Sequence, residues 1–405
     1  MQPAQGQANK GDRNKAFSKL SVHNIAVSDS FDGYVRYIGN AWLQLDGLYG
    51  ISLQPLLSWN LSPVKRAGTT MTIWPEFWCD PDVELVLEIK LGSLDGKPGF
   101  RKGWKFLMQP GMEPFTIDSS AEGYLCFSLL VRGSGFLQIG TLHCRQMLTE
   151  WGVVSAGDRR YADPYGGEAL SLFDQGDGEA PLIIHFSDFQ RRESYEDGML
   201  FRTFGVPGLT FADPRIFSGC YYIGSKEYEQ YVSQRIREVM GKLNFRWDQV
   251  IFSGFGMGAY AAVHYGIQMP SKAILMTQPV LNITRAAEGE QSLRPGRFPG
   301  AMDCLKYLMS VQDEHDQEAL NARIWNELDA ADLHRTSFAA AYMLQDDYDP
   351  TAWDDLVTHL AGKDTTLYGK GVVGRHDDEP KALRNWYLMQ YKRILTEEFG
   401  RQMGL

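Results

Sequence analysis

Three alternating glycines, between an apolar run and an alanine-rich segment, are the first feature with chemical potential. Residues 249–252 are mostly apolar, Gly254, Gly256 and Gly258 follow, and residues 259–267 have a helical composition. A strand that turns sharply into a helix is the setting of the hydrolase nucleophile motif G-x-S-x-G. The central residue here is Gly256, which has no side chain and cannot attack a carbonyl carbon.

Three interpretations of this segment compete. The first is an ordinary glycine-rich turn in an unrelated α/β fold. The second is a phosphate-binding loop, but no Lys-Ser/Thr pair follows and the G-x-G-x-x-G spacing is not met. The third, which we favour, is a hydrolase elbow that has lost its serine. Ser253 is a poor substitute nucleophile, because it precedes the tip of the turn and we expect its hydroxyl to bond the sheet or the turn.

An acid and a histidine follow in the order that such hydrolases use, nucleophile, acid, then histidine. Asp346, Asp347 and Asp349 come directly after the apolar run 338–344, and His376 lies in a later loop before the last helical segment. Each residue alone is typical of a turn or loop, but their order after the glycine turn suggests the remains of a triad. We predict Asp346 as the acid that orients His376, with the other two aspartates as alternatives.

The elements that would position these residues divide the chain into parts. Strand-like and helix-like runs alternate in the C-terminal part, which predicts an α/β domain of hydrolase type with a mostly parallel sheet. Short strand-like runs separated by turn residues dominate the N-terminal part and predict an antiparallel sandwich or barrel, of which we favour the β-sandwich. We therefore predict a disordered lead, a sandwich domain, a linker and an α/β domain, over residues 1–19, 20–150, 151–180 and 181–405 respectively.

Composition excludes several classes of function. The formal net charge is −10 and no Lys/Arg-rich run occurs, which argues against nucleic acid as the main partner. No apolar run has the roughly 18–20 residues of a membrane span, and the polar start of the chain does not resemble a secretory signal. The five cysteines are scattered and the histidines dispersed, so we expect no metal site, no cofactor and a cytoplasmic location.

From residue 120 to about 400 the sequence resembles the accessory Sec secretion-system family called accessory secretory protein two. No single stretch is decisive, but the order of the stretches is specific. They are residues 140–145 (GTLHCR), 181–187 (PLIIHFS), 212–215 (ADPR), 221–229 (YYIGSKEYE), 253–258 (SGFGMG), 278–282 (QPVLN), 293–299 (LRPGRFP), 346–349 (DDYD) and 374–378 (GRHDD).

The resemblance implies a carbohydrate-binding-like β-sandwich followed by an α/β-hydrolase domain with a serine, acid and histidine triad. It also implies a cytoplasmic protein that works with other accessory secretion proteins and supports export of a glycosylated client. Family members are similar to O-acetyltransferases that act on the glycan of that client. Carried over by position, the nucleophile falls on Gly256, the acid on Asp346 and the base on His376.

This sequence departs from the family pattern at two positions. Gly256 replaces the serine, and Asp188 stands where the family usually has glycine. The loop of Asp188 should supply one N–H of the oxyanion hole and Met257 the other. A carboxylate there would oppose the charge that develops in the transition state, unless it points away. Loss of the serine of a protease triad costs on the order of 10⁶ in kcat.

The sequence therefore supports three hypotheses on function. The first is a pseudo-hydrolase of the accessory Sec system that binds other secretion proteins or a glycosylated client. The second is an active carbohydrate O-acyltransferase or esterase, in which His376 and Asp346 serve an unconventional nucleophile or activate water. The third is a capsule- or exopolysaccharide-pathway protein of the same architecture, because fold does not fix function. Whether the chain catalyses anything is left open by the sequence.

Overall fold

The structure is a computed structural model that describes most of the chain. The described residues are 19–95, 98–118, 120–147, 157–163, 167–189, 195, 203–216, 219–295, 298, 300–311 and 316–402. Apart from residue 19, the predicted disordered lead lies outside them. The chain forms two compact units: Met1–Arg36 with Leu43–Glu150, and Tyr37–Trp42 with Trp151–Leu405.

The first unit contains a 10-stranded sheet in which every described pair of strands is antiparallel. Its elements are β1 (Lys19–Leu20), η1 (Val22–Asn24), β2 (Ile25–Val27), β3 (Tyr34–Ile38), β4 (Trp42–Trp59), β5 (Val64–Lys65), β6 (Thr70–Cys79), β7 (Val83–Gly92), β8 (Phe100–Leu107), β9 (Phe115–Ile117) and β10 (Gly123–Met147). Leu85, Leu87 and Ile89 alternate along β7 into one core. The predicted antiparallel sheet is confirmed, while the sandwich arrangement stays a prediction.

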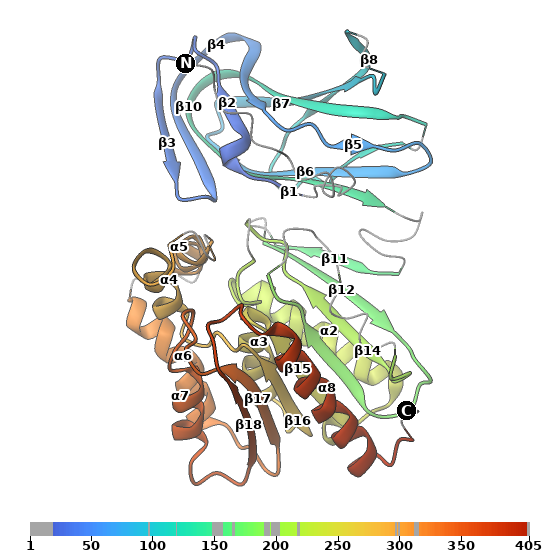
Figure 1. Cartoon of the computed structure of the whole chain (residues 1–405). Helices are drawn as coiled ribbons and strands as arrows, with labels where there is room; N and C mark the ends of the chain where they lie inside the picture. The colour runs from blue at the N-terminus through green and yellow to red at the C-terminus, as the bar shows by residue number, and fades with distance from the viewer. Residues whose placement is uncertain are drawn as a thin grey trace. The chain divides into compact units, whose positions relative to one another are not determined.

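The second unit is built on an 8-stranded sheet with the order β11-β12-β14-β13-β15-β16-β17-β18 (Figure 1). Its strands are β11 (Arg159–Ala162), β12 (Glu168–Asp174), β13 (Leu182–Phe186), β14 (Gly208–Ala212), β15 (Val250–Phe255), β16 (Ala273–Thr277), β17 (Ser337–Met343) and β18 (Thr366–Val372). Neighbouring strands from β14 to β18 are parallel, whereas β11 and β12 pair antiparallel. This unit has the mixed α/β architecture that the alternating runs predict.

The segment 151–180 is not merely a linker where the structure describes it. Its residues form β11 and β12, which extend the second sheet at one edge. The glycines, aspartates and prolines around these strands suggested a loop, but Ala169, Leu170 and Leu172 are buried on β12. The apolar residues of β12 pack once β14 provides a neighbouring strand, which a local pattern does not reveal.

Helices cover both faces of the second sheet. They are α2 (Lys226–Leu243), η2 (Trp247–Gln249), α3 (Met257–Ile267), α4 (Ile283–Ser292), α5 (Ala301–Val311), α6 (Gln317–Ala330), α7 (Ala352–Leu360) and α8 (Pro380–Glu397). Successive side chains of β15 point to opposite faces: Phe252 packs in the core with α2 and α3, and Ile251 packs with Tyr387 of α8. No helix in the described ranges is long and apolar enough to cross a membrane.

The parallel strands end at one edge of this sheet, and the segments that follow them carry the predicted site residues. They are Asp188 after β13, Gly256 after β15, Asp346 after β17 and His376 after β18. In open α/β sheets, ligands bind outside this carboxyl edge. The topology therefore gathers residues that are up to 188 positions apart in the sequence (376 − 188).

Candidate active site

Gly256 forms a strained turn between β15 and α3. Its φ is 50° and its ψ is −116°, a combination that residues with side chains rarely adopt. The Gly256 N–H donates to Thr277 O at 3.0 Å, and its carbonyl accepts from Val280 N at 3.2 Å. These two bonds hold the turn against the end of β16. The geometry is that of a residue raised on the tip of a strand-to-helix elbow.

The two flanking glycines are required by close packing of α3 against the sheet. A Cβ on Gly254 would lie 2.0 Å from Gly258 O, and a Cβ on Gly258 would lie 2.2 Å from Phe186 O. Both distances are far below any van der Waals contact, and both involve backbone atoms that have little freedom to move. The G-x-G-x-G pattern therefore reflects an approach of helix and strand that only glycine permits.

The carboxylate of Asp188 fills the space into which a side chain on Gly256 would project. A Cβ on Gly256 would lie 2.2 Å from Asp188 Oδ1 and 2.7 Å from Oδ2. Asp188 Oδ1 also accepts the backbone N–H of Met257 at 3.2 Å. The side chain thus points into the predicted oxyanion hole, and the Met257 donor expected to bind an oxyanion already holds a carboxylate.

His376 and Asp346 form a buried hydrogen-bonded pair. His376 Nδ1 lies 2.9 Å from Asp346 Oδ2 and 3.1 Å from Oδ1, and both side chains are 6% exposed. Asp346 is fixed in turn by the N–H groups of Tyr348 at 2.8 Å and Asp349 at 3.1 Å. Because Nδ1 faces a carboxylate, the proton resides there, and Nε2 has no hydrogen-bond partner among the described residues. This is how an acid orients a general base.

Electrostatics around His376 favour its protonated form. Burial lowers the pKa of the imidazole, but the hydrogen bond and charge of Asp346 raise it, as do the charges of Asp188 and Asp377. The net result is a pKa above the ordinary value for histidine. The contribution of Asp188 links the residue that fills the elbow to the residue that would act as the base.

The other two aspartates of the cluster have different roles. Asp347 Oδ1 accepts the backbone N–H of His376 at 3.2 Å. Asp349 is 2% exposed and its Oδ2 accepts the N–H groups of Leu281 and Asn282, each at 2.7 Å. Burial raises the pKa of Asp349, against the effect of these bonds. Of the three, Asp346 is the one whose carboxylate reaches the His376 ring.

Three further residues hold the histidine and were missed as site residues. The Tyr348 ring stacks on His376 with centroids 4.0 Å apart and an angle of 4°. The guanidinium carbon of Arg294 lies 4.0 Å from the centroid of the Tyr348 ring. Arg294 also donates from Nε to Asp347 O at 2.9 Å. The Gln278 side chain donates to the carbonyl of His376. All three occur in the stretches 278–282, 293–299 and 346–349, which carried the family resemblance.

Ser253 is not available as a nucleophile. It is fully buried, its Oγ donates to Ile184 O at 3.2 Å, and it lies 3.0 Å from Nδ1 of His185, which is also buried. Burial lowers the pKa of His185 to about 3, so this histidine is neutral. The hydroxyl bonds the sheet as its position before the turn predicts, away from any substrate.

No group of histidine, cysteine, aspartate and glutamate side chains in the described ranges is arranged to hold a metal ion. His315 lies outside the described residues. The described residues offer an oriented imidazole, the Asp346 carboxylate paired with it, and the Asp188 carboxylate against Gly256 and the Met257 N–H.

The family model described as the accessory Sec system GspB-transporter matches residues 8–401. An accessory Sec system protein of Staphylococcus aureus is 32% identical over 392 residues, which cover 95% of this chain and 74% of that protein. One from Streptococcus gordonii is 32% identical over 384 residues, covering 95% and 75%. A chain of the glycosylation-associated protein (Gap123) complex from Streptococcus agalactiae matches with a TM-score of 0.88 and 32% identity, over 95% of this chain and 74% of that one.

Proposed function

The chain belongs to the accessory Sec system GspB-transporter family, and we propose that it serves such a system by binding, as a pseudo-hydrolase, rather than by serine-dependent acyl transfer. The observation that carries this proposal is the Asp188 carboxylate, which occupies the space of a side chain on Gly256. An elbow that has lost its hydroxyl and gained a charge in the same space lacks the group that attacks a carbonyl.

The α/β-hydrolase assignment of the second unit is part of this proposal. Its support is the strained turn at Gly256, the tight packing at Gly254 and Gly258, and the His376–Asp346 pair at the same sheet edge. The parallel strands from β14 to β18 match the sheet that such an elbow requires. These features occur in the chain order of hydrolase triads.

The charge at the elbow opposes acyl transfer. In acyl transfer, negative charge develops on the substrate oxygen and is stabilised by N–H donors in the oxyanion hole. Here the Met257 N–H is engaged by Asp188, and a second negative charge beside it would be repelled. Loss of the nucleophile alone lowers kcat by about 10⁶ in a protease triad. Repulsion by Asp188 adds to that loss.

We infer the partners from the relatives. One solved relative is a chain of a complex of glycosylation-associated proteins. By analogy, this chain would assemble with other accessory secretion proteins in the cytoplasm and contact a glycosylated client protein or its glycan. Family membership favours this secretion role over a role in a capsule or exopolysaccharide pathway.

Hydrolysis of p-nitrophenyl acetate by the full chain and by His376→Ala tests the proposal. We expect the wild-type rate to match that of His376→Ala, because neither protein holds a nucleophile at the elbow. Wild-type turnover that His376→Ala abolishes would show an active site and overturn the pseudo-hydrolase proposal. Circular dichroism of both proteins controls for folding.

A second candidate function is an active esterase or O-acyltransferase with an unconventional nucleophile. The observation that favours it is the intact His376–Asp346 pair, beside which the Asp188 carboxylate takes the position of the serine. Either Asp188 or a water activated by His376 would then attack the acyl group. Wild-type turnover lost in both His376→Ala and Asp188→Asn would support attack by Asp188, and turnover lost only in His376→Ala would support attack by water.

A further inference from the structure

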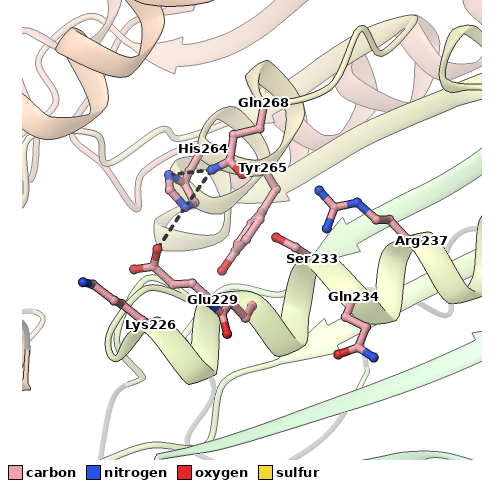
Figure 2. A pocket seen from close by; sticks show the side chains of 9 residues that line it. Lys226, Glu229, Ser233, Gln234, Arg237, His264, Tyr265 and Gln268 are labelled. Carbon is pink, nitrogen blue, oxygen red and sulfur yellow. Dashed lines mark hydrogen bonds and ion pairs between the residues drawn. The ribbon is translucent and has the colours of Figure 1, made fainter.

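A polar pocket lies in the second unit between α2 and α3, and the candidate active site does not include it. Its volume is about 570 Å³, within the usual range for ligand sites. One face of α2 supplies Lys226, Glu229, Gln230, Ser233, Gln234 and Arg237, while α3 supplies His264 and Tyr265 and is followed by Gln268 (Figure 2). Apart from Tyr265, the lining side chains are polar or charged.

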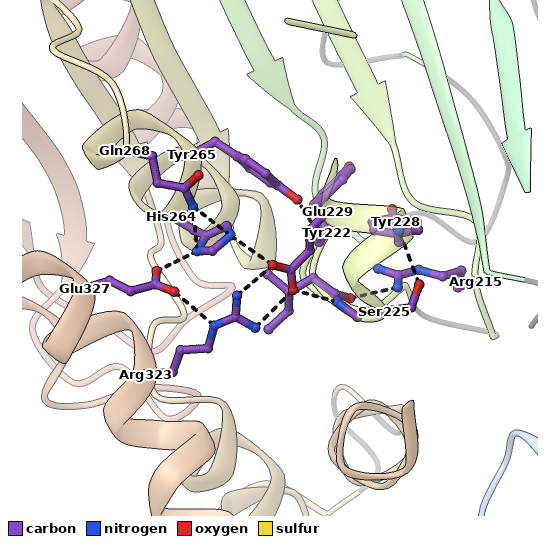
Figure 3. Close-up of polar contacts among 12 residues, drawn as sticks. Arg215, Tyr222, Ser225, Tyr228, Glu229, His264, Tyr265, Gln268, Arg323 and Glu327 are labelled. Carbon is purple, nitrogen blue, oxygen red and sulfur yellow. Dashed lines mark hydrogen bonds and ion pairs between the residues drawn. The ribbon is translucent and has the colours of Figure 1, made fainter. Parts of the chain in front are cut away.

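The floor of the pocket is held rigid by charged side chains from three helices (Figure 3). Arg323 of α6 donates to both oxygens of Glu229, at 3.0 and 2.7 Å. Glu327, also on α6, lies 2.6 Å from Nδ1 of His264 and accepts from Arg323 at 3.0 Å. Partly exposed ion pairs of this kind add little net stability. Their consequence is that Glu229 and His264 present fixed polar atoms to the pocket.

The pocket carries a local positive charge in an acidic chain. The pKa of Glu229 falls to about 2, because Arg323 and His264 outweigh the effect of burial. With His264 protonated, the floor of two cations and two carboxylates is neutral. Lys226 and Arg237 are exposed at opposite ends of the pocket, and neither forms an ion pair in the described part of the chain. Such a cleft attracts anions.

The spacing of the two cations sets the length of the anion. Lys226 and Arg237 are 11 positions apart (237 − 226) on one helix face, or about 16 Å at a rise of 1.5 Å per residue. On an extended peptide, side chains an even number of positions apart point to the same face, and two carboxylates four positions apart have Cα atoms about 13 Å apart, a span that the long Lys and Arg side chains match. Between the cations lie Gln230, Ser233 and Gln234, whose amides and hydroxyl match the N–H and C=O groups of a peptide backbone.

The pocket does not suit a ligand that stacks on an aromatic ring. Tyr265 is fully buried and its hydroxyl donates to Tyr222 O at 2.7 Å. Its ring packs edge-on against His264, so no open aromatic face lies in the pocket. From the charge, the spacing and the amide lining we propose that this pocket binds an extended acidic peptide segment of a partner protein.

Fluorescence polarisation with a labelled, end-capped peptide Glu-Ser-Thr-Ser-Glu, whose two carboxylates share one face when it is extended, tests this site on the full chain. We expect it to bind more tightly than the matched peptide with Gln at both ends, and to lose affinity as salt is added. The double variant Lys226→Gln/Arg237→Gln should weaken binding on the order of tenfold, since each exposed charge contributes modestly. Lys392→Gln removes an exposed charge on α8 and should leave the affinity unchanged.

Three outcomes would overturn the inference. The first is equal affinity for the acidic and the neutral peptide, or no binding of the acidic peptide at all. The second is undiminished binding by the double variant. The third is direct binding of inorganic tripolyphosphate, measured by calorimetry, together with no binding of the peptide, which would assign the pocket to phosphate chains. None of these measurements depends on ester hydrolysis, so they leave the proposed function of the elbow to its own test.

Discussion

Asp188 and Gly256 are sterically complementary: a Cβ on Gly256 would lie 2.2 Å from Asp188 Oδ1. The two residues follow different strands, β13 and β15, and are 68 positions apart (256 − 188). A serine at 256 and an aspartate in its present position at 188 are therefore incompatible unless the carboxylate moves. We propose that the two departures implied by the family resemblance are one structural change, because the Asp188 carboxylate fills the space that a side chain at position 256 would need.

The first prediction concerns restoration of esterase activity. Gly256→Ser alone should gain little activity, because Asp188 obstructs the hydroxyl and engages the Met257 N–H. The double variant Gly256→Ser/Asp188→Gly should hydrolyse p-nitrophenyl acetate on the order of 10²-fold faster than Gly256→Ser alone. This is the typical effect of one oxyanion-hole donor, here the Met257 N–H that Asp188 no longer occupies. The measurement is the initial rate against buffer.

The control for this prediction is His376→Ala in the double variant. It should abolish the gained activity, because the new serine needs a base. If the single variant Gly256→Ser is as active as the double variant, Asp188 does not obstruct the site.

Asp188 should also influence the titration of His376. The Asp188 charge raises the pKa of His376, so Asp188→Asn should lower it. Asp377→Asn is the matched control, because Asp377 acts on the same ring in the same direction but is the smaller contributor. NMR titration of the His376 ring measures its pKa in each of the two variants. An unchanged pKa in Asp188→Asn would show that the carboxylate does not face the imidazole.

The sequence predicts the elements of this site better than its contacts. The glycine turn, the order of Asp346 and His376, and the alternation of strands and helices follow from local patterns that each element carries by itself. The direction of the Asp188 side chain does not follow from a local pattern, because it depends on packing between two loops. The bonds of Arg323 to Glu229 join residues 94 positions apart, and Tyr348 meets His376 only after two strands are placed. Such contacts are properties of the folded chain.

We expect Asp349 to stabilise the fold rather than to take part in catalysis. Its buried carboxylate accepts the N–H groups of Leu281 and Asn282, which precede α4. Asp349→Ala leaves both donors unpaired and should cost about 2–4 kcal/mol in the free energy of unfolding. Asp347→Ala, which removes a longer bond to the His376 N–H, should cost less than about 1 kcal/mol. Urea denaturation compares the two, and equal losses would refute the assignment.

The ion pairs below the polar pocket should matter for stability in spite of their small net contribution. Arg323→Met removes the guanidinium that Glu229 and Glu327 share and leaves His264 as a remaining partner of both, so the loss should cost about 1–3 kcal/mol. These side chains are 20–27% exposed, so solvent reduces the loss below that of a fully buried pair. Arg246→Met removes an exposed pair and should leave the urea transition unchanged.

The last prediction is a pH dependence that arises from His264. Burial lowers the pKa of His264, but hydrogen bonds and charges of Glu229 and Glu327 raise it by more than burial lowers it. The pKa in the folded chain therefore lies above the unfolded value of about 6.5. The stabilisation is then complete below pH 6.5 or so and is lost as pH rises through the folded pKa. His264→Gln should reduce the free energy of unfolding more at about pH 6 than at about pH 8.5, measured by urea denaturation at each pH. A loss that is equal at both pH values would mean that His264 is neutral in the folded chain.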